Sequence, residues 1–119
     1  MNRLIEVRSY KLKPGNAAEF HAVVSMQAVP MLREWGTDVV VFGPSAHEAD
    51  TYFLVRSYES LEDLNARQDA FYGSEAWRNG PREAVIGKIE SYLSTVLWLS
   101  AAGVASMREL NEMPAMASR

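Results

Sequence analysis

The sequence has no cysteine among its 119 residues, which excludes disulfides, thiolate metal ligands and a thiol nucleophile. No apolar run is long enough to be a membrane span. The net charge is −3 and comes without a basic stripe of the kind that binds nucleic acid or anionic membranes. No nucleophile elbow, phosphate-binding loop or dinucleotide fingerprint occurs, which argues against the hydrolases and nucleotide enzymes that carry them.

The length of the chain suits one domain. Glu6 interrupts the N-terminal segment before a signal-peptide core could form. We therefore expect a cytoplasmic, globular protein that has neither a nucleic-acid nor a membrane partner.

One four-residue segment occurs twice. Val7-Arg8-Ser9-Tyr10 reappears as Val55-Arg56-Ser57-Tyr58, and each copy ends a strand-like run and precedes a helix-like run. Two copies are too few for a solenoid. They fit a small domain built from two β-α-β halves.

The pattern of apolar residues predicts four strands and two helical regions. Alternation and β-branched runs favour strands at residues 3–12, 39–42, 51–58 and 92–99. Helical spacing favours a first helix over residues 17–35, kinked or split by Pro30, with Asn16 as its N-cap.

A second helical region follows Ser60, its expected N-cap, and is interrupted at Gly73 and at Gly80-Pro81. The order β-α-β-β-α-β predicts an α+β, ferredoxin-like fold: a four-stranded, antiparallel-containing sheet with the helices on one face. Residues 1–100 are expected to form this domain, and residues 101–119 a tail or a short helix.

In that topology we expect residues 3–12 and 51–58 to form parallel, adjacent central strands. Ile5, Val7, Phe53 and Val55 would then face the helices. The opposite, uncovered face would carry Leu4, Glu6, Arg8, Tyr10, Leu12, Tyr52, Leu54, Arg56 and Tyr58. Left bare, such a patch is large for a monomer, so the sequence predicts a homodimer in which two sheets pack face to face around a two-fold axis.

Two arginines share this predicted face with a single acid. Arg8 and Arg56 would project from neighbouring strands about 4.8 Å apart, and one carboxylate, Glu6, cannot neutralise both. An anionic ligand such as a carboxylate or an enolate would satisfy the excess charge through bidentate hydrogen bonds. The alternative is that the arginines are part of the dimer interface. Their hydrogen bonds would then go to Glu6, tyrosine hydroxyls, acids of the partner chain and water. The candidate ligand-binding residues are Glu6, Arg8, Tyr10, Tyr52, Arg56 and Tyr58.

Three residues are candidates for moving a proton: Tyr10, Tyr58 and His21. His21 borders the apolar stripe of the first helix, where it has either a structural role or that of a base at the mouth of a cavity. His47 lies in a polar loop with Glu48 and Asp50, but no further spacing of histidines and acids supports a metal site. We expect neither a metal nor a cofactor.

Three segments resemble the NIPSNAP family. Residues 5–15 are similar to its opening Glu-x-Arg-x-Tyr-x-x-x-Pro-Gly string, and residues 56–63 to its Trp/Arg-x-Tyr-x-Ser-Leu stretch. Residues 74–77, Ser-Glu-Ala-Trp, lie where the family tends to have a small residue, an acid and a tryptophan. The resemblance covers residues 3–99. It departs at residues 64–66, Leu-Asn-Ala, where a more arginine-rich run is expected.

The resemblance implies a dimeric α/β barrel, in which two ferredoxin-like chains pack their sheets together. It implies no defined reaction, although relatives of this architecture include cofactor-free monooxygenases, lactone isomerases and haem-handling enzymes. Three functions therefore stay open: binding of a small anionic or aromatic molecule between the two sheets, cofactor-independent monooxygenation or isomerisation, and a non-enzymatic dimerisation or assembly module.

Overall fold

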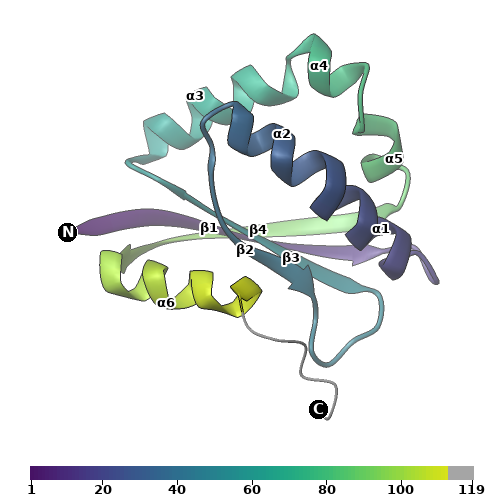
Figure 1. The fold of residues 1–119 in the computed structure, drawn as a ribbon, viewed down its shortest axis with the longest axis horizontal. Coiled ribbons are helices and arrows are strands. Elements are labelled where there is room, and N and C mark those ends of the chain that lie inside the picture. The colour runs from purple at the N-terminus through teal and green to yellow at the C-terminus, as the bar shows by residue number, and fades with distance from the viewer. Residues whose placement is uncertain (113–119) are drawn as a thin grey trace.

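The computed structural model describes residues 1–112. One sheet forms the centre of the fold, with its strands in the order β2-β3-β1-β4 and every neighbouring pair antiparallel (Figure 1). The strands are β1 (Asn2–Leu12), β2 (Asp38–Pro44), β3 (Thr51–Tyr58) and β4 (Ile89–Ser100).

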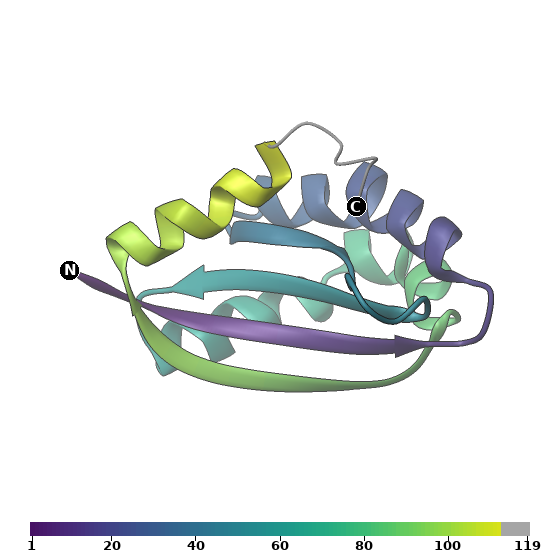
Figure 2. The ribbon, with the colours of Figure 1, turned by 90° about the horizontal axis from the view of Figure 1, so that it is seen from below.

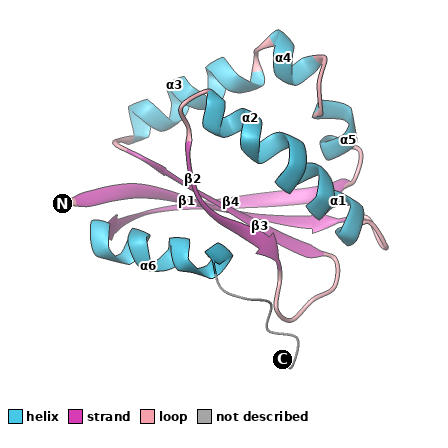
Figure 3. Ribbon diagram, in the orientation of Figure 1, coloured by secondary structure: helices cyan, strands magenta, loops and turns pink. Residues whose placement is uncertain are grey.

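The helices lie on both faces of this sheet (Figure 1, Figure 2). One face is covered by α1 (Ala17–Val23), η1 (Val24–Ala28), α2 (Val29–Glu34), α3 (Leu61–Tyr72), α4 (Glu75–Arg78) and α5 (Arg82–Ile86), and the other face by α6 (Ala101–Glu112). The element order β-α-β-β-α-β, drawn in Figure 3, confirms the predicted α+β, ferredoxin-like fold. Within residues 1–112, no helix has the length and apolar character needed to cross a bilayer.

Pro30 interrupts the first helical region as the sequence predicts. Proline has no N–H for the helical ladder, and the turn before α2 is a π-helix, η1, that joins α1 to α2. π-helical turns widen a helix locally and recur at functional sites. Val24 and Ala28, the ends of η1, are buried against the sheet.

Hydroxyl N-caps start the second helical region. Ser60 Oγ accepts a hydrogen bond from the Asp63 N–H at 3.0 Å, and Ser74 Oγ accepts one from the Trp77 N–H at 3.2 Å. Asn16 is the N-cap residue of α1, as predicted, but its side chain donates to the carbonyl of Lys13 at 3.1 Å and makes no capping hydrogen bond.

The prediction that β1 and β3 are parallel is wrong. The loop between β2 and β3 is short enough to reverse the chain, so β3 runs opposite to β2. β3 lies between β1 and β2 and pairs with both in the antiparallel sense. β1 and β2 are therefore parallel to each other, and β3 runs opposite to both. In this register Val7 lies opposite Val55, whereas Glu6 lies opposite Arg56 and Arg8 opposite Leu54.

The predicted assignment of the two sheet faces is inverted. The helix face, defined here as the one covered by α1–α5, carries Leu4, Glu6, Arg8, Tyr10, Leu12, Tyr52, Leu54, Arg56 and Tyr58. The α6 face carries Ile5, Val7, Phe53 and Val55, which pack with Val104 and Met107 of α6. Both faces are buried along the central strands, so alternation alone cannot tell which of them the helices cover.

Helix α6 packs on the chain's own sheet and covers one of its two edges. The side-chain amide of Asn111 accepts from the N–H of Phe42 at 3.0 Å and donates to its carbonyl at 2.8 Å. Arg108 donates to Asp38 at 2.7 Å. The backbone groups of Phe42 on the β2 edge are thereby hydrogen-bonded to α6. Residues 113–119 of the predicted tail lie outside the described residues.

Replacing Val104 by alanine tests whether α6 is anchored by its apolar contact. Val104 is buried against Ile5 and Val55, so Val104→Ala should lower the free energy of unfolding by about 1–3 kcal/mol, the value of two buried methyl groups with their cavity. Urea denaturation measures it. Leu110→Ala is the control on the same helix, since Leu110 is half exposed. Equal losses for both variants would contradict this account.

Candidate ligand site

A buried ion pair lies at the centre of the helix face. Oε1 of Glu6 accepts hydrogen bonds from Nε and Nη2 of Arg56 at 3.1 and 2.7 Å. Nη1 of Arg56 donates to the hydroxyl of Tyr72 at 2.7 Å. The Arg56 side chain is 1% exposed, and each of its three nitrogens donates a hydrogen bond within the protein. The role of Arg56 is therefore structural.

Arg8 is held differently. Its Nη2 donates to Oε2 of Glu6 at 2.8 Å and to Oε1 of Gln68 at 3.3 Å, and its Nε donates to Ser94 Oγ at 3.1 Å. Its guanidinium carbon lies 4.7 Å from the ring centroid of Tyr92, within cation–π range. These three hydrogen bonds use Nε and Nη2 of Arg8. Among the side-chain hydrogen bonds of residues 1–112, none uses its Nη1, which can therefore donate to a ligand.

Helix α3 supplies the polar groups opposite the sheet. Gln68 and Tyr72 are four residues apart and therefore share one side of the helix. Nε2 of Gln68 donates to Oε1 of Glu6 at 2.8 Å and to the hydroxyl of Tyr58 at 3.2 Å. The two α3 residues thus fix both sides of the Glu6–Arg56 pair.

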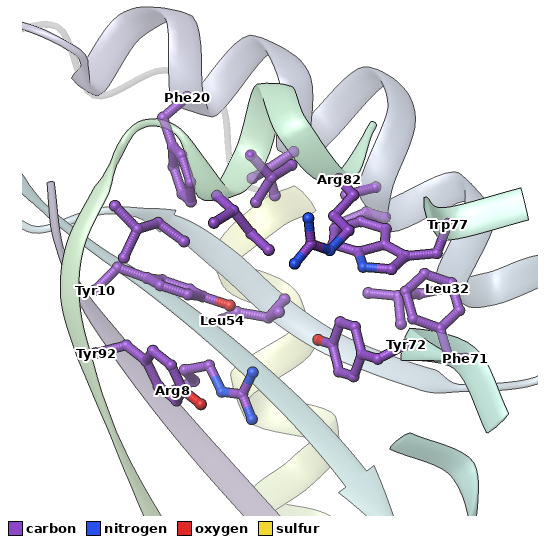
Figure 4. A pocket seen from close by; sticks show the side chains of 16 residues that line it. Arg8, Tyr10, Phe20, Leu32, Leu54, Phe71, Tyr72, Trp77, Arg82 and Tyr92 are labelled. Atoms are coloured by element: carbon purple, nitrogen blue, oxygen red, sulfur yellow. The ribbon is translucent and has the colours of Figure 1, made fainter. Parts of the chain in front are cut away.

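A cavity of about 330 Å³ lies between the helix face and the helices (Figure 4). Arg8 and Tyr10 form part of its strand side, and Tyr72, Trp77 and Arg82 come from α3, α4 and α5 (Figure 4). The rest of the lining is apolar or aromatic: Phe20, Val24, Ala28, Val29, Leu32, Leu54, Phe71, Val85, Ile86, Ile89 and Tyr92. No acidic side chain of the described part of the chain lines it.

Aromatic contacts hold the helical wall of the cavity in place. The Trp77 ring packs against Phe71 and Tyr72, with centroids 5.3 and 5.4 Å apart. Phe20 packs against Tyr10 at 5.4 Å on the opposite side. Such rings form a rigid, mostly apolar wall with a few polar edges, as is common in small-molecule sites.

The charge states follow from this environment. Burial alone would raise the pKa of the Glu6 carboxyl, but Arg56 and Arg8, helped by Ser94, outweigh it and lower that pKa. Burial and, next, Tyr72 raise the pKa of Tyr10 to about 12 against the opposing arginines. At neutral pH one carboxylate therefore faces two guanidinium groups, a net charge of +1, beside a neutral tyrosine.

The comparisons with known proteins agree with this fold. The NIPSNAP family model matches residues 5–102. The chain belongs to the NIPSNAP family. A NIPSNAP family protein from Agrobacterium tumefaciens superposes with a TM-score of 0.75 at 16% identity, over 83% of this chain and 87% of that one. A NIPSNAP-like domain protein from Burkholderia xenovorans gives 0.75 at 18% identity, over 83% and 86%.

A third, more distant likeness is to a proposed antibiotic biosynthesis monooxygenase from Bordetella bronchiseptica. Its TM-score is 0.61 at 21% identity, over 84% of this chain and 97% of that one. At such identities these structures show a shared fold alone. Among curated protein sequences, none matched this chain.

The structure brings only part of the predicted site to the cavity of this NIPSNAP domain. Arg8 and Tyr10 line it, whereas Glu6, Arg56 and Tyr58 form the buried polar cluster beside it. The sequence analysis placed these residues in a space between the sheets of two chains. Because they lie on the helix face, they instead line or adjoin a cavity within one chain.

Tyr52 and His21 lie elsewhere. The Tyr52 hydroxyl is 2.6 Å from Nδ1 of His21, and neither residue lines the cavity. His47 and Glu48 are exposed, and no cluster of three or more histidines, aspartates or glutamates suited to a metal occurs among residues 1–112.

The sequence reasoning missed Tyr72, Trp77 and Arg82 as lining residues. Tyr72 ends α3, whereas Trp77 and Arg82 reach the cavity because α4 and α5 fold back over the sheet after Gly73 and Gly80. No local pattern specifies this tertiary arrangement. Gln68 did leave a signal, since it is a polar residue on the otherwise apolar stripe of its helix.

Removing the Glu6 charge should destabilise the protein. Glu6→Gln leaves two buried guanidinium groups without their carboxylate, and breaking such a pair costs about 3–5 kcal/mol. Because the folded pKa of Glu6 is below its ordinary value of 4.5, its contribution is fully present above pH 4.5 and is lost as the pH falls through the lower folded value.

Urea denaturation of both proteins between pH 7 and pH 3 measures this difference. The difference in the free energy of unfolding between wild type and Glu6→Gln should become smaller toward pH 3. Glu90→Gln is the control, since Glu90 is half exposed and pairs with Lys11 at the surface, where such a pair contributes at most about 1 kcal/mol. A gap that does not change with pH would contradict the assignment.

Proposed function

We propose that this NIPSNAP domain binds a small, largely apolar or aromatic molecule carrying an anionic group, in the cavity between its sheet and its helices. The observation that supports the proposal is the guanidinium of Arg8 at the wall of a mostly apolar and aromatic cavity, which no acidic side chain of the described residues lines. The cytoplasmic location expected from the sequence stays a prediction.

Arg8 is the cation suited to a ligand, and Arg56 is not. The Glu6 carboxylate compensates one positive charge and is bonded to both arginines, but Arg56 has its three nitrogens in hydrogen bonds within the fold. Arg8 keeps Nη1, and a ligand carboxylate there would neutralise the remaining charge of the cluster. The low polarity around the site strengthens that attraction.

The size of the cavity limits the ligand. A volume of about 330 Å³ is at the lower end of the range for small-molecule sites. A single aromatic ring with its substituents suits this volume and its aromatic walls.

Cofactor-independent oxygenation or isomerisation is supported only by the shared fold. With its pKa raised to about 12, Tyr10 is a hydrogen-bond donor at neutral pH and a poor base. The geometry therefore supports binding more strongly than a particular reaction.

Replacing Arg8 should abolish most of the binding while leaving the fold intact, because Glu6 and Arg56 still neutralise each other. Benzoate is the probe, measured by isothermal titration calorimetry at low salt. Arg8→Met should weaken its affinity by roughly tenfold or more, the value of a charge-assisted hydrogen-bond pair.

Arg78→Met is the matched control, since Arg78 is exposed on α4 and does not line the cavity. The proposal fails if wild-type protein does not bind benzoate, or if Arg8→Met binds it as tightly as wild type does.

We also propose that two copies of the chain associate through β4. This strand carries one charged residue, Glu90, in twelve, and is exposed along almost its whole length. Its exposed apolar side chains lie on both faces: Tyr92, Leu93, Val96, Leu97 and Trp98. Exposed edges of this kind are normally blunted by charges or covered.

A second copy is the occupant that the fold favours. The other edge of the sheet, β2, is capped by Asn111 of α6. If a two-fold axis lies beside β4, each chain covers the β4 strand of the other. The helix face cannot serve as the interface predicted from the sequence, because α1–α5 cover it.

Charges placed on β4 should dissociate the dimer. Leu93→Lys combined with Leu97→Lys puts two cations on the α6 face of the strand, where like charges of the two copies repel. Light scattering with size-exclusion chromatography at micromolar concentration should give a dimer for wild type and a monomer for the variant. Leu61→Lys, at an exposed site on α3, should stay dimeric. A monomeric wild-type protein refutes the proposal.

A further inference from the structure

We infer that the ligand is a dicarboxylate: an aromatic or short unsaturated diacid whose second carboxylate is bound by Arg82. This inference rests on the proposed function, since it concerns the same cavity. Its basis is a second guanidinium at the same cavity, contributed by a different part of the chain.

Arg82 reaches the cavity from the helix side. It is the first residue of α5, whereas Arg8 belongs to the central strand β1. Both side chains line the cavity. In Figure 4 the guanidinium of Arg82 points into it beside Trp77, and that of Arg8 rises from the strand below Tyr72. The two cations therefore approach the same space from opposite walls.

Each arginine is anchored by one carboxylate that is not part of the lining. Nη2 of Arg8 donates to Glu6 at 2.8 Å, and Nη1 of Arg82 donates to Glu83 at 2.7 Å. That bond to Glu83 is the one side-chain hydrogen bond of Arg82 within residues 1–112, so its Nε and Nη2 stay available. Both arginines are thus oriented by a protein acid and keep donors for a ligand.

The two ends differ in their exposure to solvent. The Arg8 side chain is 12% exposed and that of Arg82 is 42% exposed. The Arg8 end is therefore the inner one and the Arg82 end is the mouth. We expect the inner carboxylate to contribute more to affinity than the outer one, because solvent weakens an exposed charge pair.

Apart from the two arginines and the hydroxyl groups of Tyr10, Tyr72 and Tyr92, the lining is apolar and partly flat. Leu54 lies on the sheet side, and the rings of Phe71, Tyr72 and Trp77 lie on the helix side. A rigid planar spacer with an anionic group at each end matches this order of cation, apolar wall and cation. A ligand with one anionic end would leave the second guanidinium without an acceptor inside the cavity.

Three probes of similar shape test the inference: benzoate, terephthalate and monomethyl terephthalate. The last one keeps the ring and the length of the diacid but has one charge fewer. Affinities are measured by isothermal titration calorimetry for wild type, Arg82→Met, Arg82→Lys and the exposed control Arg78→Met. Arg82 is partly exposed, so these variants should fold, and circular dichroism checks this.

The wild type should bind terephthalate roughly five- to tenfold more tightly than the monomethyl ester. Arg82→Met should abolish this preference, because it weakens the binding of terephthalate more than that of benzoate. Arg82→Lys should retain part of the preference, and Arg78→Met should retain all of it.

Two results would overturn the inference without affecting the proposed function: a wild type that binds the diacid and its ester equally, or an Arg82→Met variant that keeps the preference. A wild type that binds none of the three probes overturns both.

Discussion

The buried pair of Glu6 and Arg56 is the interaction on which the rest of this structure depends. A carboxylate and a guanidinium inside a fold are tolerated only when both are fully hydrogen-bonded, and here further bonding partners come from two other elements, α3 and β4. Arg56 Nη1 bonds to Tyr72 of α3, and the Glu6 oxygens also bond to Gln68 of α3 and Ser94 of β4. The pair therefore fixes the position of α3 and β4 relative to the central strands.

The same pair determines what the remaining cation can do. Glu6 supplies one negative charge, and Arg8 adds a second positive charge at the wall of the cavity. The fold thereby separates two arginines that look equivalent in the sequence. Arg56 stabilises the packing of α3 on the sheet, whereas Arg8 presents a donor to a space enclosed by aromatic side chains.

Much of the fold follows from the sequence, because the strands, the Ser60 N-cap and the interruption at Pro30 depend on local patterns. The face of the sheet that receives the helices could not be predicted, since Ile5 and Val55 on one side and Tyr52 and Leu54 on the other are equally buried. The position of Arg56 opposite Glu6 depends on strand direction. Of the residues that line the cavity, Arg8 and Tyr10 were among the candidates named from the sequence, whereas Trp77 and Arg82 reach it only through the tertiary path of α4 and α5.

The most direct test of this division of roles is a side-chain NMR titration. Correlation spectra of the arginine Nε–H groups, assigned by arginine-to-lysine variants, are recorded while benzoate is added to wild-type protein. We expect the Arg8 resonance to shift in a saturable manner, because its guanidinium binds the carboxylate, while the Arg56 resonance stays in place. A saturable shift of Arg56 with Arg8 unchanged, or no shift of either, would contradict the account.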